Sequence, residues 1–297
     1  MDAQYICPAL TAFCHDGSVD MEAMKVIYDR LIASGLDGIA VMGSSGEFYG
    51  MALEQAKQYA RESLAYIDGR IPVYIGTGRL IAEETILLSN YALQYGASAV
   101  MVVGPYYIGT GQAGVEAYYD AVAGQVNGNI ILYNFPDRTG HDISGETVLS
   151  LRKKHSNIIG IKDTVGAPSH TRQLIQCIKP VYPDFKIYSG YDDNFAHVVI
   201  SGGDGCIAAL SNLIPEACSG WVQAFRDHDL GQITNIQRTI NKFMGFYSLS
   251  NPFMPAMKYA LSVLGLPVNG DCMLPAVPAS EGQKKQVDAL LKDCGLI

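Results

Sequence analysis

Short apolar runs alternate with longer segments of helical spacing along most of this chain. Most runs are rich in small or β-branched apolar residues, as expected of strands buried on both faces of a parallel sheet. Consecutive runs mostly start about 25–35 residues apart, which leaves room for a returning helix between parallel strands. The eight expected strands are Ile6–Phe13, Gly38–Met42, Ile71–Ile75, Ala99–Val103, Ile130–Tyr133, Ile158–Lys162, Phe185–Tyr188 and Gly205–Leu210.

The segments between these runs carry signals that begin and end helices. Asp20 is expected to cap a helix whose apolar face includes Met24 and Leu31, and Gly35 follows where helices commonly end. Ser144 is expected to cap a helix that runs to residue 155, with basic residues in its last turn. Further helices are expected at Glu54–Tyr66, Glu83–Tyr95 and Ser169–Ile178.

Eight alternating units of strand and helix predict a (β/α)₈ TIM barrel with a C-terminal helical extension. We expect the catalytic barrel to span residues 1–227, with a helix at Ile214–Phe225 completing the eighth unit. Residues 228–297 form the expected extension, with helices at Gly231–Tyr247, Pro255–Leu264 and Glu281–Leu291. The alternative is a doubly wound open sheet, but the first run lacks the glycine-rich turn typical of that fold.

Composition narrows the classes of partner. Hydrophobic residues make up 48% of the 297 residues and charged residues 17%, with a formal net charge of −8. The acidic balance argues against nucleic acid or an anionic membrane surface as a partner. The low charged fraction is typical of a chain that also buries surface against other subunits, so we expect a homo-oligomer.

The cysteines, the histidines and the N-terminus point to a cytoplasmic protein without a metal site. Seven cysteines are scattered without a C-x-x-C pair, which fits reduced thiols better than a disulfide framework. The six histidines show no ligand spacing, so no metal is expected. The first residues lack the features of a signal peptide, and no apolar stretch approaches the ~18–20 residues of a membrane span.

Lys162 is the first candidate for chemistry. It ends the run Ile158–Lys162, and a lysine at the exit of a buried strand is costly to desolvate. A desolvated lysine can attack a carbonyl as the free amine. A lysine whose head reaches back to water is the structural alternative, and for an isolated lysine it is the favoured interpretation.

The ends of other strands meet at the same mouth of a barrel, and several carry suitable groups. Ser44 and Ser45 lie in a small turn whose backbone N–H groups could hold a carboxylate or phosphate. Tyr133 and Arg138 offer a proton carrier and a carboxylate fork, although each is also common at a barrel rim. Gly190 could allow a ligand to approach the backbone closely.

Four motifs together resemble the dihydrodipicolinate synthase/N-acetylneuraminate lyase family of pyruvate-dependent class I aldolases. The resemblance covers essentially the whole chain and implies that the protein is a lyase with the TIM-barrel fold. The motifs, in the order and spacing of that family, are G-S-S-G-E (43–47), P-Y-Y (105–107), Y-N-F-P-D-R-T (133–139) and G-I-K-D-T (160–164).

The resemblance implies a role for each candidate residue. Lys162 would form a Schiff base with pyruvate or a related 2-keto acid, so a covalent pyruvate imine takes the place of a cofactor. Tyr133 would carry protons, assisted by Ser44 and by Tyr107 from a neighbouring subunit of a tetramer built as a dimer of dimers. The substrate would be bound by Ser45, Arg138, Gly190 and Ile207.

The substrate is less clearly indicated than the reaction class. Arg138 favours a dihydrodipicolinate synthase-like reaction of pyruvate with aspartate semialdehyde, whose carboxylate it would hold. Asp163-Thr164 resembles the 2-keto-3-deoxy-sugar acid aldolases instead, which are the alternative, and the two serines at 44–45 differ from the two threonines of typical synthases. N-acetylneuraminate lyase is a third possibility. A keto-acid-binding sensor barrel is the non-enzyme alternative, but a sensor has no reason to keep the lysine, the tyrosine and the serine turn together.

Overall fold

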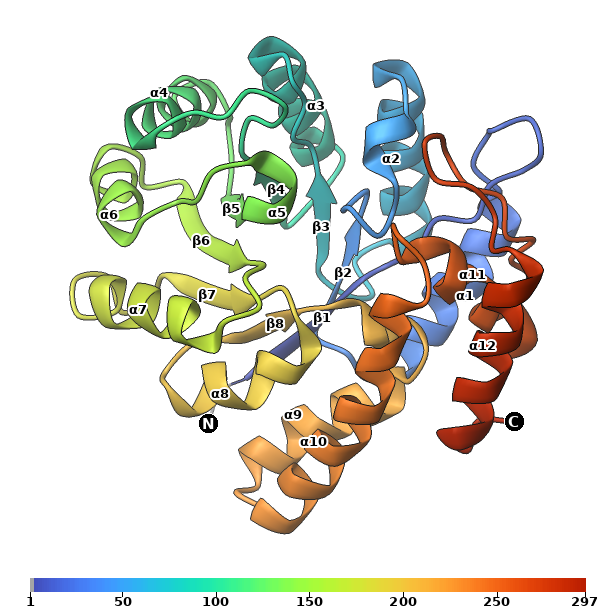
Figure 1. The fold of residues 1–297 in the computed structure, drawn as a ribbon. Helices are drawn as coiled ribbons and strands as arrows, with labels where there is room; N and C mark the ends of the chain where they lie inside the picture. Colours follow the sequence, from blue (N-terminus) through green and yellow to red (C-terminus); the bar gives the residue numbers. More distant parts are fainter. Residues whose placement is uncertain (1–2) are drawn as a thin grey trace.

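Eight parallel strands close into a barrel in which each strand pairs with the next along the chain and β8 pairs with β1. The computed structural model describes residues 3–297. The central strands and the surrounding helices, drawn in Figure 1, confirm the predicted (β/α)₈ barrel. The strands are β1 Gln4–Pro8, β2 Gly38–Val41, β3 Val73–Gly76, β4 Ala99–Val103, β5 Ile130–Asn134, β6 Ile158–Asp163, β7 Lys186–Ser189 and β8 Gly205–Ile207.

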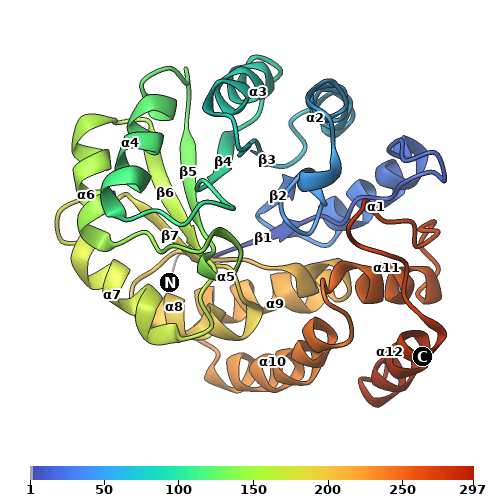
Figure 2. The ribbon, with the colours of Figure 1, turned by 45° about the horizontal axis from the view of Figure 1, so that its top comes forward.

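Helices cover the outside of the barrel, and three more follow it. Figure 2 shows α10 lying along the outer side of α9, with α11 and α12 next to each other near the C-terminus. The helices are α1 Met21–Ala33, α2 Leu53–Ile67, α3 Ala82–Gln94, α4 Gln112–Ala123, α5 Pro136–Thr139, α6 Gly145–Lys154, α7 Pro168–Ile178, α8 Phe195–Ile200, α9 Pro215–Arg226, α10 Leu230–Phe243, α11 Met254–Val263 and α12 Glu281–Asp293. Short 3-10 turns are η1 Phe48–Gly50, η2 Asp192–Asn194, η3 Ala209–Asn212 and η4 Met244–Ser248.

The predicted helix starts are confirmed in their details. The Asp20 carboxylate accepts a hydrogen bond of 3.0 Å from the Ala23 N–H, and the Ser144 hydroxyl accepts one of 3.2 Å from the Thr147 N–H. Each bond satisfies a backbone donor that the first turn of a helix leaves free. Gly35 follows α1 with a φ of +79°, a left-handed conformation that favours glycine.

Two strands, β1 and β8, end several residues before their predicted ends. β1 ends at Pro8, because the next residues leave the ladder and the Leu10 N–H donates to the Asn212 side chain at 3.0 Å. β8 ends at Ile207 and gives way to η3, whose Asn212 makes that contact. The apolar runs continue past both strands because the loops at this end of the barrel are themselves buried.

Two layers of apolar side chains hold the barrel together. One lies between the strands and the helices, and the other fills the barrel interior. Along β5 the layers alternate: Ile131 and Tyr133 belong to the interior, whereas Ile130 and Leu132 pack against the helices. Among residues 3–297, no helix is both long and apolar enough to cross a bilayer.

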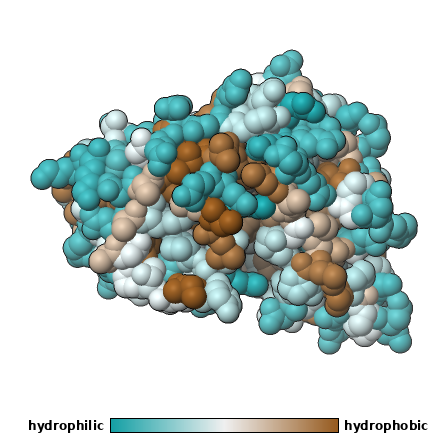
Figure 3. All heavy atoms as spheres, turned by 90° about the horizontal axis from the view of Figure 1, so that it is seen from above, coloured by the Kyte–Doolittle hydropathy of each residue, from teal (hydrophilic) through white to brown (hydrophobic). Residues whose placement is uncertain are grey.

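The surface mixes polar and apolar atoms. On the face seen from above, hydrophobic patches lie among hydrophilic residues (Figure 3). Large hydrophobic residues exposed in the structure include Leu80, Ile81 and Leu87 in and before α3, and Tyr107 and Ile108 in the loop after β4. Exposed apolar residues of this size are common at interfaces between subunits.

Candidate active site

Lys162 lies inside the barrel near the C-terminal end of β6. Lys162 is 4% exposed, and its Nζ is 4.4 Å from the centroid of the Tyr133 ring. Tyr133 on β5 and Lys162 on β6 are direct partners in the parallel ladder. Within residues 3–297 no carboxylate forms an ion pair with Lys162. Once it has lost its proton, this amine is therefore free to attack a carbonyl carbon.

Tyr133 links the lysine to the serine turn after β2. Its hydroxyl is 3.2 Å from the Ser44 Oγ, and either oxygen can donate. The Tyr133 ring stacks on Phe135 with centroids 6.0 Å apart. The stacking and the hydrogen bond fix both ends of the phenol, so that its oxygen can pass a proton between a bound molecule and Ser44.

A cavity of about 220 Å³ opens above these groups. It is lined by seven of the eight residues that the sequence predicted for catalysis and binding: Ser44, Ser45, Tyr133, Arg138, Lys162, Gly190 and Ile207. Residues from five strand ends therefore meet at one mouth, as the barrel fold requires. The volume suits a small molecule.

Tyr107, the eighth predicted residue, does not line this cavity. It is 87% exposed in the loop between β4 and α4 and has a φ of +77°. The adjacent Tyr106 turns inward instead and packs edge-on against Phe48. The P-Y-Y motif thus splits into one tyrosine near the site and one that points away from its own barrel.

Arg138 lies at the rim of the cavity on the short helix α5. Its guanidinium carbon is 5.7 Å from the centroid of the Phe135 ring, and the side chain is otherwise exposed. Arg138 also borders a second cavity of about 180 Å³, lined by Ser44, Phe48, Tyr49, Val103, Tyr106, Phe135, Arg138, Thr139, Phe253 and Met254. None of the ion pairs in the described chain includes this arginine, which leaves it available to an anionic ligand.

The comparisons with known proteins agree with this geometry. The family model described as "Dihydrodipicolinate synthetase family" matches residues 2–294. The chain belongs to this family. The crystal structure of YagE, a prophage protein of the dihydrodipicolinic acid synthase family from E. coli K12 in complex with pyruvate, superposes with a TM-score of 0.96. The sequences are 37% identical, and the match covers 99% of each chain.

Curated relatives carry two kinds of name. "Probable 2-dehydro-3-deoxy-D-pentonate aldolase YjhH" of Escherichia coli K12 is 37% identical over 98% of this chain and 97% of its own. The 4-hydroxy-tetrahydrodipicolinate synthase of Kosmotoga olearia is 34% identical over 94% of each. One relative is named as an aldolase and the other as a synthase. This member of the dihydrodipicolinate synthetase family is therefore an enzyme of the lyase class, of the aldolase type.

Gly190 leaves room for a neighbouring side chain. A Cβ at this position would lie 1.9 Å from the Thr164 Oγ1 and 2.6 Å from the Thr164 Cβ. Thr164 thus approaches the Gly190 backbone closely, and both residues line the cavity. Thr164 is 5% exposed, and its hydroxyl has no hydrogen-bond partner in the described part of the chain.

Thr164 and the C-terminal wall of the cavity were not predicted from the sequence. Tyr247, Ser248, Ser250, Asn251 and Phe253 line the cavity from the segment between α10 and α11. The Tyr247 hydroxyl donates to Asp192 at 2.6 Å, which ties this wall to the barrel. Burial raises the pKa of the Asp192 carboxyl to about 6. No strand-end rule points to residues that come from beyond the barrel.

Glu47, the last residue of G-S-S-G-E, points away from the cavity. It is fully buried, has a φ of +58° and pairs with Lys258 of α11. The Met273 N–H donates to its other oxygen at 2.7 Å. Burial raises the pKa of the Glu47 carboxyl, opposed by the neighbouring ammonium. The pair anchors the serine turn to the C-terminal helices.

Asp163 also lies outside the cavity. It is fully buried, and its carboxylate is engaged by Asn134, His170 and Thr171 behind the strand. In the sequence, Asp163 is an indicator of the substrate class. The oxygens of its carboxylate, however, cannot contact a molecule inside the barrel. No group of three or more His, Cys, Asp or Glu side chains suited to a metal ion occurs within residues 3–297.

Proposed function

We propose that this enzyme is a class I aldolase that cleaves or forms a 2-keto-3-deoxy sugar acid through a Schiff base on Lys162. The observation that carries the proposal is the pairing of Lys162 with Tyr133, whose hydroxyl contacts Ser44. An amine beside an ordered proton carrier is what imine chemistry on a keto acid requires. Pyruvate, one product of the cleavage, is bound in the related YagE structure.

In the proposed mechanism the Lys162 Nζ attacks C2 of the keto acid, and loss of water gives an iminium. Tyr133, as the phenolate, removes the proton from the hydroxyl on C4. The C3–C4 bond then breaks, its electron pair forms the enamine, and an aldehyde leaves. Tyr133 returns the proton to C3, and water hydrolyses the imine to release pyruvate and the free amine. Ser44 and Ser45 hold the carboxylate throughout.

The substrate class is supported by three observations. YjhH, 37% identical, is named as a pentonate aldolase, and YagE, 38% identical, as a candidate 2-dehydro-3-deoxy-D-gluconate aldolase. The Thr164 hydroxyl is buried at the cavity without a partner, where a hydroxylated substrate can supply one. Serines at 44 and 45 also differ from the two threonines expected of a typical synthase.

A second candidate is the synthase reaction, in which pyruvate condenses with aspartate semialdehyde. Arg138 favours it, because a free guanidinium at the rim of the cavity suits the carboxylate of that acceptor. The 34% identical relative from Kosmotoga olearia bears the synthase name. The two candidates share the Schiff base and differ in what Arg138 and Thr164 contact.

We further propose that the enzyme is a cytoplasmic homotetramer, a dimer of dimers in which Tyr107 serves the neighbouring subunit. The exposed Tyr107 and Ile108 support this, since large apolar side chains at a loop tip favour a protein partner. All seven cysteines are free thiols, as a reducing compartment keeps them. Sedimentation analysis of the purified chain tests the assembly, and a monomer with full activity would contradict it.

The Schiff base is tested by borohydride reduction in the presence of pyruvate, followed by peptide mass spectrometry. The expected adduct is on Lys162, and it should be absent from Lys162→Ala but present in Lys153→Ala, which changes an exposed lysine of α6. Cleavage of 2-keto-3-deoxy-pentonate and -gluconate is then compared with condensation of pyruvate and aspartate semialdehyde. A higher kcat/KM for the condensation would replace the first candidate with the second.

A further inference from the structure

The residues that directly follow Tyr133 and Lys162 are joined to each other on the far side of the strands. Asn134 and Asp163 are partners in the same ladder, one position beyond Tyr133 and Lys162. The Asn134 Nδ2 donates to the Asp163 Oδ1 at 2.9 Å. Because side chains alternate along a strand, the first pair faces the cavity and the second pair faces the helices.

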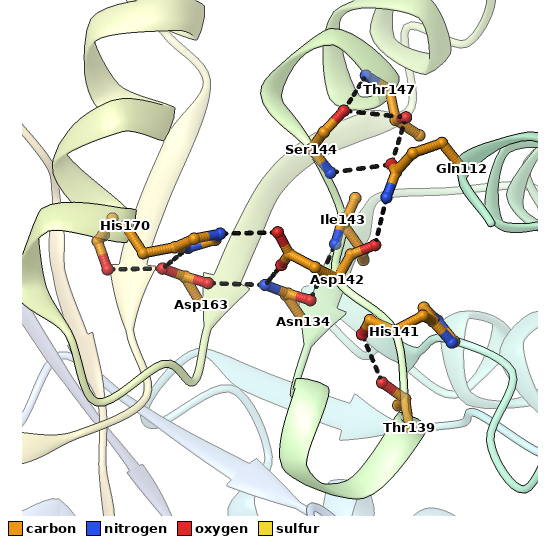
Figure 4. A network of polar contacts seen from close by, with 11 residues as sticks. Gln112, Asn134, Thr139, His141, Asp142, Ile143, Ser144, Thr147, Asp163 and His170 are labelled. Carbon is orange, nitrogen blue, oxygen red and sulfur yellow. Dashed lines mark hydrogen bonds and ion pairs between the residues drawn. The ribbon is translucent and has the colours of Figure 1, made fainter. Parts of the chain in front are cut away.

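A polar network fixes this buried second pair (Figure 4). Asn134 also donates to the Asp142 Oδ1 at 2.6 Å, and its own carbonyl oxygen accepts from the Ile143 N–H at 3.1 Å. His170 lies between the two carboxylates, with Nε2 2.9 Å from Asp142 and Nδ1 3.0 Å from Asp163. The Thr171 hydroxyl donates to the Asp163 Oδ2 at 2.6 Å.

Every polar atom of the buried pair is thus engaged by a partner. Both Asp163 oxygens and both ends of the Asn134 amide make hydrogen bonds, and neither residue is more than 1% exposed. The partners come from three places: the 141–143 loop, the first turn of α7 and the opposing strand. A fully satisfied network of this kind permits one arrangement of its members.

We propose that Asn134, Asp142, Asp163 and His170 are positioning residues that set the placement of Lys162 relative to Tyr133. The inference rests on the proposed Schiff-base function but not on the identity of the substrate. The network reaches no atom inside the cavity, and none of its four members lines it. It acts through the backbone, since a shift at Asp163 or Asn134 moves the adjoining residue on the cavity side.

The network has a cost that stability alone does not explain. It buries the Asp163 carboxylate and most of the His170 imidazole, where an apolar cluster of similar volume is often as stable or more stable. Such a network is useful where orientation matters, because hydrogen bonds fix direction and apolar contacts do not. A misplacement of about 1 Å at reacting groups can lower a rate roughly 100-fold.

The test separates formation of the imine from proton transfer. The imine on Lys162 is trapped with borohydride in the presence of pyruvate, and proton transfer is followed as deuterium exchange at the pyruvate methyl group in D2O. For Asp163→Asn we expect trapping to persist and exchange to slow about 10–100-fold, with KM for the keto acid changed less than about threefold. Thr171→Val, which removes one donor to Asp163, should slow exchange by a smaller factor.

The matched control is His155→Gln. His155 also pairs with a carboxylate, Asp120, at 2.7 Å, but at the end of α6 and away from the catalytic strands. The His155→Gln variant should exchange at the wild-type rate, whereas His170→Gln should slow the exchange about tenfold. Circular dichroism confirms that each variant is folded under the assay conditions.

The outcomes separate this inference from the proposed function. If wild type traps and exchanges pyruvate while Asp163→Asn, His170→Gln and Thr171→Val exchange at the wild-type rate, the network is structural only and the inference is wrong. If the slowing in these variants equals that in His155→Gln, the inference fails in the same way. If wild type forms no adduct at all, the proposed function fails first and the inference with it.

Discussion

Lys162 faces Tyr133 because β6 contains one extra residue relative to β5. Ile130 pairs with Ile158, but the next residue of β5, Ile131, pairs with Gly160. Ile159 is thus the extra residue of a β-bulge, which re-aims the side chains that follow. Without it, Tyr133 would be opposite Ile161, and the lysine would turn towards the helices. The bulge therefore brings the amine and the phenol together.

Gly160, which follows the extra residue, leaves room for the backbone of β7, and Gly160→Ala should disturb both stability and activity. A Cβ there would lie 2.7 Å from the Lys186 carbonyl oxygen, a backbone atom that cannot easily move. We expect a loss of about 1–3 kcal/mol in the free energy of unfolding and a clear fall in kcat. Urea unfolding and steady-state kinetics measure the two effects.

Gly166→Ala is the control in the same segment, because a Cβ at Gly166 would meet nothing within 4 Å. It should keep wild-type stability and kcat. If the two alanine variants have the same stability and kcat, the role proposed for Gly160 at the bulge is wrong.

The bulge also shows where sequence analysis reached its limit. The apolar runs predicted eight strands, and the rule that barrel sites lie at strand ends brought seven predicted residues to one cavity. The sequence places Lys162 at the end of a strand, but it cannot say which face the lysine occupies, since one extra residue reverses that face. The resemblance supplied the role of Lys162, which its position alone did not establish.

The missed parts of the site come from contacts between segments that are distant in sequence. Tyr247 reaches the cavity from beyond the barrel, and Asp192, which holds it, is 55 residues away. Asp163 indicates a substrate class through its place in the motif, although its side chain faces the helices and binds His170. For residues that follow a catalytic strand position, alternation could have indicated this outward direction.

Thr164→Val tests the substrate class. The change keeps the shape of the side chain and removes a hydroxyl that has no partner in the described chain, so folding should be little affected. We expect about a tenfold lower kcat/KM for cleavage of a 2-keto-3-deoxy sugar acid, through loss of one hydrogen bond to substrate. Deuterium exchange of pyruvate serves as the internal control, because pyruvate lacks the hydroxyl groups of a sugar acid. The exchange rate of the variant should stay near that of wild type.

Arg138→Ala separates the two candidate substrates. Because the side chain is exposed and forms no ion pair within residues 3–297, its removal should leave the fold intact. Cleavage of a sugar acid should lose less than about tenfold in kcat/KM, whereas condensation with aspartate semialdehyde should lose about 100-fold or more. Both reactions are measured with the same preparation. A large loss for the sugar acid would contradict the preferred assignment.

The buried pair of Glu47 and Lys258 predicts a large effect of single changes and a smaller one of the double change. Lys258→Met leaves the Glu47 carboxylate buried without its ion partner and should cost about 3–5 kcal/mol of stability. Glu47→Gln combined with Lys258→Met removes both charges and should recover part of that loss. Urea unfolding of wild type, the single variants and the double variant measures the coupling energy between the two residues. Purely additive losses of stability would show that this coupling energy is zero.

The pH dependence of stability tests the charge state of His170. Hydrogen bonds to Asp142 and Asp163 raise its pKa from 6.5 to about 10, so the charged imidazole stabilises the folded state. A pKa that is raised on folding gives a contribution that is complete below about pH 6.5 and is lost as the pH rises towards 10. Wild type should therefore lose about 2–3 kcal/mol more than His170→Gln between pH 6.5 and 10, measured by urea unfolding. Parallel curves of stability against pH for the two proteins would mean that His170 is neutral in the folded state. The interpretation of its contacts with Asp142 and Asp163 as ion pairs would then be wrong.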